Sequence, residues 1–296
     1  MPLDQPSSTL GANRRSLLKN VGLGAAALGT LAAGAKLTPA RAQTGPSPTD
    51  VLNFALNLEY LEAEFYLRAT TGQGLASMYT TSGSGTPGGT VTGGSQVPFV
   101  TPRVSDIAVN IALDEFNHVK FLRAALGSSA VAEPDIDLST SFTTLARAAG
   151  IVGATGTFDP FANENDFLLG AYIFEDVGVS AYSGAAGYLA DSPYLGYAAG
   201  ILATEAYHGG SLRTLLIEKV PGFYRAANAI SALRAKLSGA QDDIGPFYAD
   251  VTHIGDVDSN SIAFARTPAQ VLNVVYGGGA ASNYLFFPNK LNGAVQ

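Results

Sequence analysis

The chain has 296 residues, of which 47% are hydrophobic and 14% charged, a balance that can bury a sizeable core and excludes a largely disordered protein. The formal net charge is −7 and basic residues form no stripe beyond residue 42, so nucleic acid is excluded as an expected partner. The absence of cysteine excludes disulfides, thiolate metal sites and cysteine nucleophiles.

The first 42 residues are typical of a cleavable export signal. The pair Arg14 and Arg15 is followed by an uncharged run rich in Gly, Ala and Leu over residues 21–35, and a small-residue site ends at Ala42. This order resembles a twin-arginine signal, which implies a periplasmic or extracellular protein. A membrane anchor is the alternative, but the run is shorter than the ~20 residues that a span needs. Cleavage after Ala42 would leave 12 basic and 23 acidic side chains, a net charge of −11, and no later stable membrane span is expected.

Apolar residues at three- and four-residue steps predict an all-α fold with four long helices. The four predicted helices cover residues 50–70, 103–126, 160–189 and 192–219. Shorter helices are expected over residues 140–149, 224–237 and 267–276. Residues 71–102 are rich in Gly, Pro, Ser and Thr, which predicts a long loop that is either functional or mobile. We therefore expect a bundle over residues 43–222 and a partly helical extension, residues 223–296, packed on it.

Two of the three histidines share one motif, Glu-x-x-His, on two of the predicted long helices. Glu115 precedes His118 and Glu205 precedes His208, and three residues is nearly one helical turn. The carboxylate and the imidazole of each motif therefore project from one face, where they can bind one metal ion together. The third histidine, His253, has no such partner and is expected to be a solvated loop residue.

The other two long helices each offer a carboxylate with a tyrosine seven residues later. Glu59 is followed by Tyr66, and Glu175 is followed by Tyr182, which places each pair along one helical stripe. The tyrosines are candidates either for hydrogen bonding or a redox role near the site, or for plain packing in the bundle. The chain thus repeats a two-helix unit, and such a repeat suits two equivalent metal ions.

One carboxylate from each of two helices and Glu-x-x-His from each of the other two resemble the ferritin-like superfamily of carboxylate-bridged dimetal four-helix bundles. Three segments extend this likeness to the desiccation-related ferritin-like proteins. These segments are residues 52–66 (LNFALNLEYLEAEFY), 265–268 (ARTP) and 286–293 (FFPNKLNG). The resemblance implies a ferritin-like four-helix bundle with a long Gly-rich loop between its first two helices.

Carried over residue by residue, the resemblance implies two iron or manganese ions. Two carboxylates would bridge the ions, and each ion would have one imidazole and one terminal carboxylate. The implied ligands are, in that order, Glu115 and Glu205, His118 and His208, and Glu59 and Glu175. Glu62 lies one turn after Glu59 and is a candidate seventh ligand, a partner of a ligand, or the true ligand of its helix. Asp114 is the candidate acceptor for the second ring nitrogen of His208. Glu64 and Glu218 are expected to face solvent.

These residues predict an exported dimetal protein that reacts with a small oxidant, dioxygen or hydrogen peroxide, as an oxidase, peroxidase or catalase-like enzyme in oxidative or desiccation stress. The alternative is a non-catalytic metal-binding or structural stress protein. A substrate-specific oxygenase is a third option without a pocket to support it. No Gly-x-Ser-x-Gly motif occurs, which disfavours a serine hydrolase. A homo-oligomer is left open, whereas the long loop and the extension disfavour a many-subunit storage shell.

Overall fold

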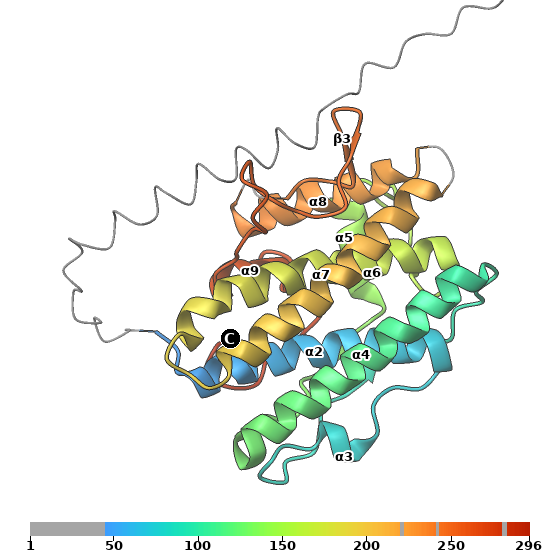
Figure 1. The fold of residues 1–296 in the computed structure, drawn as a ribbon. Helices are drawn as coiled ribbons and strands as arrows, with labels where there is room; N and C mark the ends of the chain where they lie inside the picture. Colours follow the sequence, from blue (N-terminus) through green and yellow to red (C-terminus); the bar gives the residue numbers. More distant parts are fainter. Residues whose placement is uncertain (1–44, 220–221, 241–242, 280–282) are drawn as a thin grey trace, which may run out of the picture. The chain divides into compact units, whose positions relative to one another are not determined.

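Four long helices form the centre of the computed structural model, which describes residues 45–219, 222–240, 243–279 and 283–296 (Figure 1). They are α2 (Pro48–Thr71), α4 (Pro102–Leu126), α6 (Glu164–Ala185) and α7 (Leu195–Glu218). Helix α2 packs chiefly against α4 and α6 against α7, and the pairs meet where α2 faces α6 and α4 faces α7. The expected all-α bundle is therefore confirmed, whereas the predicted export signal lies outside the described residues.

Side-chain capping sets where α2 and α6 begin. Ser47 caps α2 in a capping box with Asp50, and Pro48 occupies its first turn, where a missing backbone N–H costs nothing. Helix α6 begins four residues later than residue 160, where the apolar pattern placed it. The reason is Asn163, whose side chain accepts from the backbone N–H groups of Asn165 and Asp166 and so fixes the helix start at Glu164.

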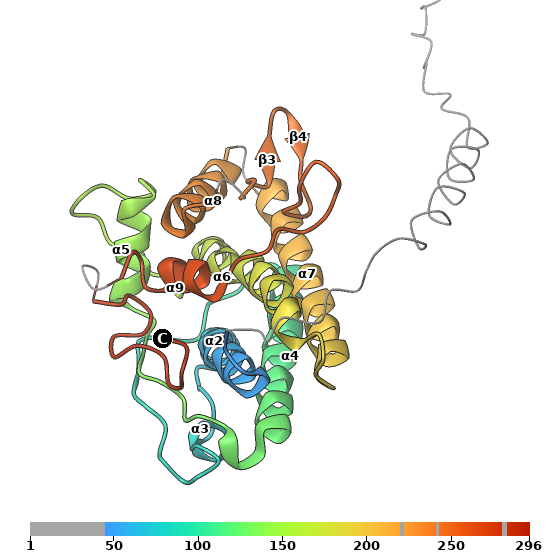
Figure 2. The same ribbon diagram turned by 90° about the vertical axis from the view of Figure 1, so that its left-hand side faces the viewer.

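The shorter elements fill the loops and the C-terminal part. They comprise the helices α3 (Ser77–Thr80), α5 (Thr140–Ala148), α8 (Tyr224–Ser238) and α9 (Pro268–Val275), the 3₁₀ turns η1 (Gly127–Ser129) and η2 (Ala186–Leu189), and the strands β1 (Val91–Thr92), β2 (Ile136–Asp137), β3 (Phe247–Tyr248) and β4 (Val251–Thr252). The strands form only two short pairs, parallel β1 with β2 and antiparallel β3 with β4. Both α8 and α9 pack beside α6 (Figure 2).

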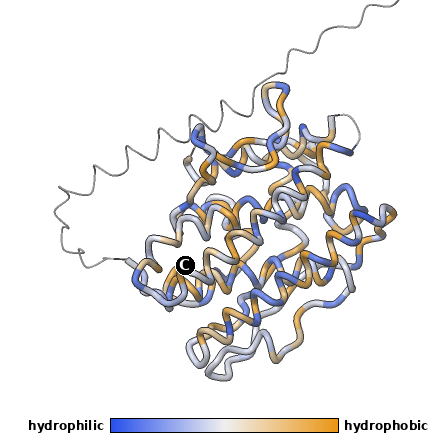
Figure 3. The backbone as a smooth tube through the Cα atoms, in the orientation of Figure 1, coloured by the Kyte–Doolittle hydropathy of each residue, from blue (hydrophilic) through white to orange (hydrophobic). Residues whose placement is uncertain are grey.

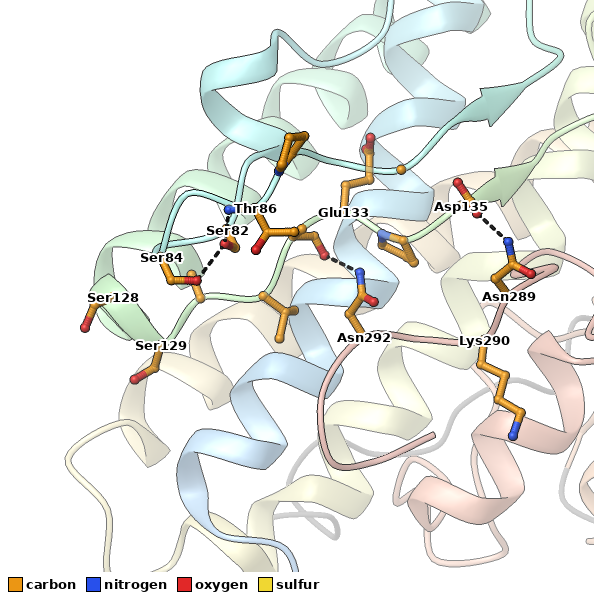
Figure 4. Close-up of a pocket in the computed structure, with 16 residues that line it drawn as sticks. Ser82, Ser84, Thr86, Ser128, Ser129, Glu133, Asp135, Asn289, Lys290 and Asn292 are labelled. Carbon is orange, nitrogen blue, oxygen red and sulfur yellow. Dashed lines mark hydrogen bonds between the residues drawn. The ribbon is translucent and has the colours of Figure 1, made fainter.

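The long loop after α2 is held by the segment that follows α4. The N–H of Gly83 donates to the carbonyl of Ala130 (2.8 Å), and the N–H of Gly89 donates to the carbonyl of Glu133 (2.9 Å). A hollow of about 470 Å³ lies along this seam and is bordered by the C-terminal tail (Figure 4). There Asn289 donates to Asp135 at 2.6 Å, so the tail is hydrogen-bonded to the loop region.

The tail also enters the hydrophobic core. Phe286 is 1% exposed, and its ring centroid lies 5.1 Å from those of both Phe142 and Phe174. Burying one such ring is worth roughly 1.5–3 kcal/mol. Asn57 of α2 accepts from the backbone N–H of Asn292 (3.0 Å) and donates to its carbonyl (2.8 Å). The tail therefore lies over the bundle and completes the core.

None of the helices that the structure describes is both long and apolar enough to cross a membrane. Polar residues interrupt the apolar ones along the long helices (Figure 3).

A buried ion network joins α6 and α7 to the C-terminal part. Asp176 accepts from Arg213 at 2.8 Å and from Arg234 at 2.6 Å. Arg234 also binds Asp243 (2.7 Å), and Asp243 in turn accepts from Arg266 (3.1 Å). Burial alone would raise the pKa of Asp176, but the two guanidinium groups outweigh it and lower that pKa to about 2. The sequence analysis did not predict this network.

The expectation that Glu64 faces solvent is wrong. Its side chain is buried, and its carboxylate accepts from Arg68 (2.6 Å) and from the backbone N–H of Leu75 (2.6 Å). The loop after α2 folds back over this face of the helix, which helical periodicity alone does not reveal. Glu218, by contrast, is exposed as expected. Burial and the neighbouring Glu64 raise the pKa of Glu133 to about 9.

We expect Glu133→Gln to stabilise the protein above about pH 5. The unfolded chain ionises this carboxyl near its ordinary pKa of 4.5, whereas the folded protein keeps it protonated up to about pH 9, so stability is lost as pH rises between these values. The variant removes that loss, on the order of 3 kcal/mol at pH 7. Urea unfolding at pH 4 and pH 8 would measure it. An equal effect of the substitution at both pH values would contradict the protonated state.

Candidate metal centre

Six acidic and histidine side chains from the four long helices meet inside the bundle. Helix α2 supplies one of them, α6 one, and α4 and α7 two each. They are Glu59, Glu175, Glu115, His118, Glu205 and His208. The four carboxylates are at most 1% exposed and the imidazoles at most 9%. We refer to these six side chains as the carboxylate–imidazole cluster.

The cluster divides into two groups that could each hold a metal ion. In each group, one ligand atom from every member lies within 4.8 Å of the others. One group is Glu59, Glu115, His118 and Glu205, and the other is Glu115, Glu175, Glu205 and His208. Glu115 and Glu205 belong to both groups, so these two carboxylates lie where they can bridge two neighbouring ions. The sequence analysis assigned the same roles to the same residues.

Both imidazoles turn Nδ1 toward the carboxylates. In the first group, Nδ1 of His118 lies 3.2 Å from Oε2 of Glu59 and 3.2 Å from Oε2 of Glu115. In the second, Nδ1 of His208 lies 2.9 Å from Oε1 of Glu115 and 3.3 Å from Oε2 of Glu175. The two ring centroids are 6.4 Å apart. The arrangement is thus repeated about Glu115, with one imidazole and one further carboxylate on each side.

Several of these buried atoms have no hydrogen-bond partner among the described residues. They are Oε1 of Glu115, Oε2 of Glu175, both carboxylate oxygens of Glu205, and Nδ1 of His208. A buried acceptor without a donor is costly, and facing carboxylates repel one another. A divalent cation would relieve both costs, and carboxylate oxygen with neutral imidazole is a donor set that iron and manganese accept. The residues present therefore fit a metal pair.

The pKa values of the metal-free cluster reflect the same crowding. Burial and the neighbouring carboxylates raise the pKa of Glu205 well above its ordinary range, and burial raises that of Glu59 to about 7. Burial would also raise the pKa of Glu115, but the two neighbouring imidazoles outweigh it and lower that value. Despite burial, the surrounding carboxylates raise the pKa of His118 to about 11. Metal binding must therefore displace protons from the cluster.

Each tyrosine predicted near the site bonds the carboxylate of the opposite helix. The hydroxyl of Tyr66 on α2 donates to Glu175 on α6, and the hydroxyl of Tyr182 on α6 donates to Glu59 on α2. Of the two alternatives left open by the sequence, the structure shows the hydrogen-bonding one. These reciprocal bonds leave the second oxygen of each carboxylate directed toward an imidazole.

Glu62 is buried next to the cluster but belongs to neither group. Burial and the charges of Glu115, Glu175 and Glu59 raise its pKa well above the ordinary range. Its place in the internal repeat is taken on α6 by Gly178, which lies three residues after Glu175 as Glu62 does after Glu59. A Cβ at position 178 would lie 2.3 Å from Oε2 of Glu205, so a side chain there would displace that carboxylate. The sequence analysis missed the role of this glycine, although its offset from Glu175 was visible.

Asp114 lies where the sequence placed it, beside His208. Its Oδ2 is 3.2 Å from Nε2 of His208, while its side chain remains 33% exposed at the seam between α4 and α7. A carboxylate at this distance holds the proton on Nε2 and leaves the Nδ1 lone pair free to bind metal. His253, which was predicted to be a solvated loop residue, is half-buried, and its carbonyl accepts from Arg213.

Comparisons with known proteins agree with this geometry. Residues 47–218 match the family described as the ferritin-like domain. The chain is 34% identical over 247 residues to the desiccation-related protein PCC13-62 of Craterostigma plantagineum, a match that covers 76% of each chain. It is 29% identical over 265 residues to the ferritin-like catalase Nec2 of Nesocodon mauritianus, covering 83% of this chain and 84% of that one. No solved structure matches the chain significantly.

We expect Asp114→Asn to weaken metal binding by about tenfold, because partners of ligating histidines typically contribute 10–100-fold to affinity. A neutral amide can still accept from Nε2 of His208, but it makes the imidazole a poorer donor. Asp106→Asn, at an exposed acid on the same helix, is the matched control. Titration with Mn²⁺, followed by calorimetry, measures both affinities. Equal affinities in the two variants would remove Asp114 from the site.

Proposed function

The chain belongs to the ferritin-like domain family, and we propose that it binds two iron or manganese ions and decomposes hydrogen peroxide in an exported, stress-protective role. The observation that carries this proposal is the sharing of Glu115 and Glu205 between two groups of potential ligands. Carboxylates shared in this way would hold two ions at the short separation that two-metal chemistry needs. Two redox-active ions at that separation can together supply or accept the two electrons of an O–O bond cleavage.

The protein's own residues would orient the metal ligands and exclude water from the site. Asp114 fixes the ring of His208, and the tyrosine hydroxyls of Tyr66 and Tyr182 fix the two terminal carboxylates. These bonds hold the ligand side chains in place and so reduce the rearrangement that these side chains undergo during the reaction. Burial of all six side chains excludes bulk water from the centre.

The choice of hydrogen peroxide rests on the site and on one relative. The cluster is enclosed by four helices, which favours a reactant as small as peroxide over a bulky organic substrate. The relative called a ferritin-like catalase aligns over most of both chains. In the proposed reaction two molecules of hydrogen peroxide give two of water and one of dioxygen, so no further reductant is required.

The mature chain, loaded with Mn²⁺ or Fe²⁺, should contain two ions per chain and release one dioxygen for every two peroxide molecules consumed. Glu205→Gln should lose at least one ion and most of the turnover, since it removes a carboxylate shared by both groups. Glu218→Gln, at an exposed position, should match the unsubstituted protein. Elemental analysis and an oxygen electrode provide the two measurements.

Two outcomes would count against this function. Two ions per chain without turnover of peroxide or dioxygen would leave the non-catalytic metal-binding alternative. Unchanged metal content in Glu205→Gln would show that this carboxylate does not bridge.

We further propose that residues 1–42 direct the protein out of the cytoplasm. The support is the order of the paired arginines, the uncharged run and the small-residue site ending at Ala42. Transport of a folded protein suits a centre whose metals are inserted during folding. Replacing Arg14 and Arg15 together by lysine should retain the protein in the cytoplasm, whereas Lys19→Arg should not. Cell fractionation of a bacterial host distinguishes the two, and normal export of the double variant would contradict the signal type.

A further inference from the structure

Two small apolar cavities lie in series beside the carboxylate–imidazole cluster. The inner cavity, of about 20 Å³, is walled by α2, α6, α9 and the C-terminal tail. The outer cavity, also about 20 Å³, lies between α5, α6, α8 and α9. Ile173 of α6 and Val274 of α9 line both cavities, so these two side chains form the boundary between them.

The inner cavity ends at the cluster. Gly178 and Glu62 are among its lining residues. Because a Cβ at position 178 would lie 2.3 Å from Oε2 of Glu205, that carboxylate packs directly against the backbone of Gly178. At this wall a residue without a side chain therefore lies between the inner cavity and one of the two shared carboxylates.

The outer cavity ends at the protein surface. Its lining includes Ala149, Ile151 and Leu237, all of which are partly exposed. Together the two cavities extend from this surface region to Gly178, beside Glu205, and Ile173 and Val274 lie at the boundary between them.

The walls of both cavities suit a small apolar molecule. Each cavity holds roughly one molecule of the size of water, and an apolar lining offers water too few hydrogen-bond partners to retain it. Arg234 is the charged residue lining the outer cavity, but its guanidinium is paired with Asp176 and Asp243. Dioxygen is small and apolar and loses no hydrogen bonds on entering such a space.

Partly exposed polar side chains border the cluster at another place. The partly exposed Asp114 contacts His208 at the seam between α4 and α7, and the side chain of His118 is 11% exposed. Hydrogen peroxide, which donates and accepts hydrogen bonds, is suited to this polar seam. The polar and apolar approaches reach the cluster through different helices.

We propose that the inner and outer cavities form a route for dioxygen between the protein surface and the carboxylate–imidazole cluster, separate from the polar approach taken by peroxide. The identity of the gas rests on the proposed function, in which dioxygen is the product. The cavities themselves predict occupancy by any small apolar atom, whether or not the protein turns over peroxide.

Krypton provides this test because it is apolar and scatters anomalously. Crystals of the metal-loaded protein under krypton pressure should show krypton between Ile173 and Val274. Val274→Ile adds a methyl group at the boundary and should abolish the krypton signal and lower peroxide turnover several-fold. Val271→Ile, also buried on α9 but lining neither cavity, is the matched control and should retain both.

The results separate this inference from the proposed function. Absence of krypton from the unsubstituted protein, a measurement that needs no variant, would overturn the route. Krypton in both cavities with equal turnover in Val274→Ile and Val271→Ile would also overturn it. Bound krypton in a protein that never turns over peroxide would reject the proposed function while leaving the cavities as gas sites. If Val274→Ile fails to fold, Ile173→Met tests the same boundary.

Discussion

The structure depends on how the bundle tolerates carboxylates that it has removed from water. Four carboxylates are buried in two overlapping groups with Glu62 beside them, which costs free energy unless positive charge or protons accompany them. In the metal-free protein, protonated imidazoles and acids supply that compensation, as the raised pKa values of His118, His208 and Glu205 show. Metal ions would also compensate the negative charge, and they would provide partners for the carboxylate oxygens that lack a hydrogen bond. Metal binding and the stability of the bundle are therefore coupled.

Two consecutive residues of α6 show the difference between a structural and a reactive carboxylate. Asp176 is matched by two guanidinium groups from α7 and α8, and its pKa falls to about 2. Glu175, which points to the other side of the helix, faces an imidazole and further carboxylates, and its pKa is raised by burial. The extension contributes Arg234, Asp243 and Arg266 to the structural side. By fixing Asp176 it also fixes the helix that presents Glu175.

The parts of the site that sequence could predict were those encoded within single helices. Helical geometry predicts that the two side chains of Glu-x-x-His share one face of their helix, but it does not predict the contacts between helices. The seven-residue offsets marked Tyr66 and Tyr182 as neighbours of the site, but not that each bonds the carboxylate of the other helix. Glu64 was wrongly expected to face solvent because the loop that follows α2 folds back over it. Asp176 and its arginines escaped notice because their pairing spans segments that only the fold brings together.

The internal repeat is broken at two places, and both breaks bear on access to the cluster. Asp114 precedes Glu115 on α4, whereas Thr204 precedes Glu205 on α7, so a charged group stands at the solvent side of only one motif. Glu62 on α2 corresponds to Gly178 on α6, so a side chain is missing on one wall, next to Glu205. The first break makes the α4–α7 seam polar, and at the second the carboxylate of Glu205 packs against a glycine that also lines the apolar inner cavity. Two symmetric halves would build a metal pair, but the departures from symmetry give its surroundings a polar and an apolar side.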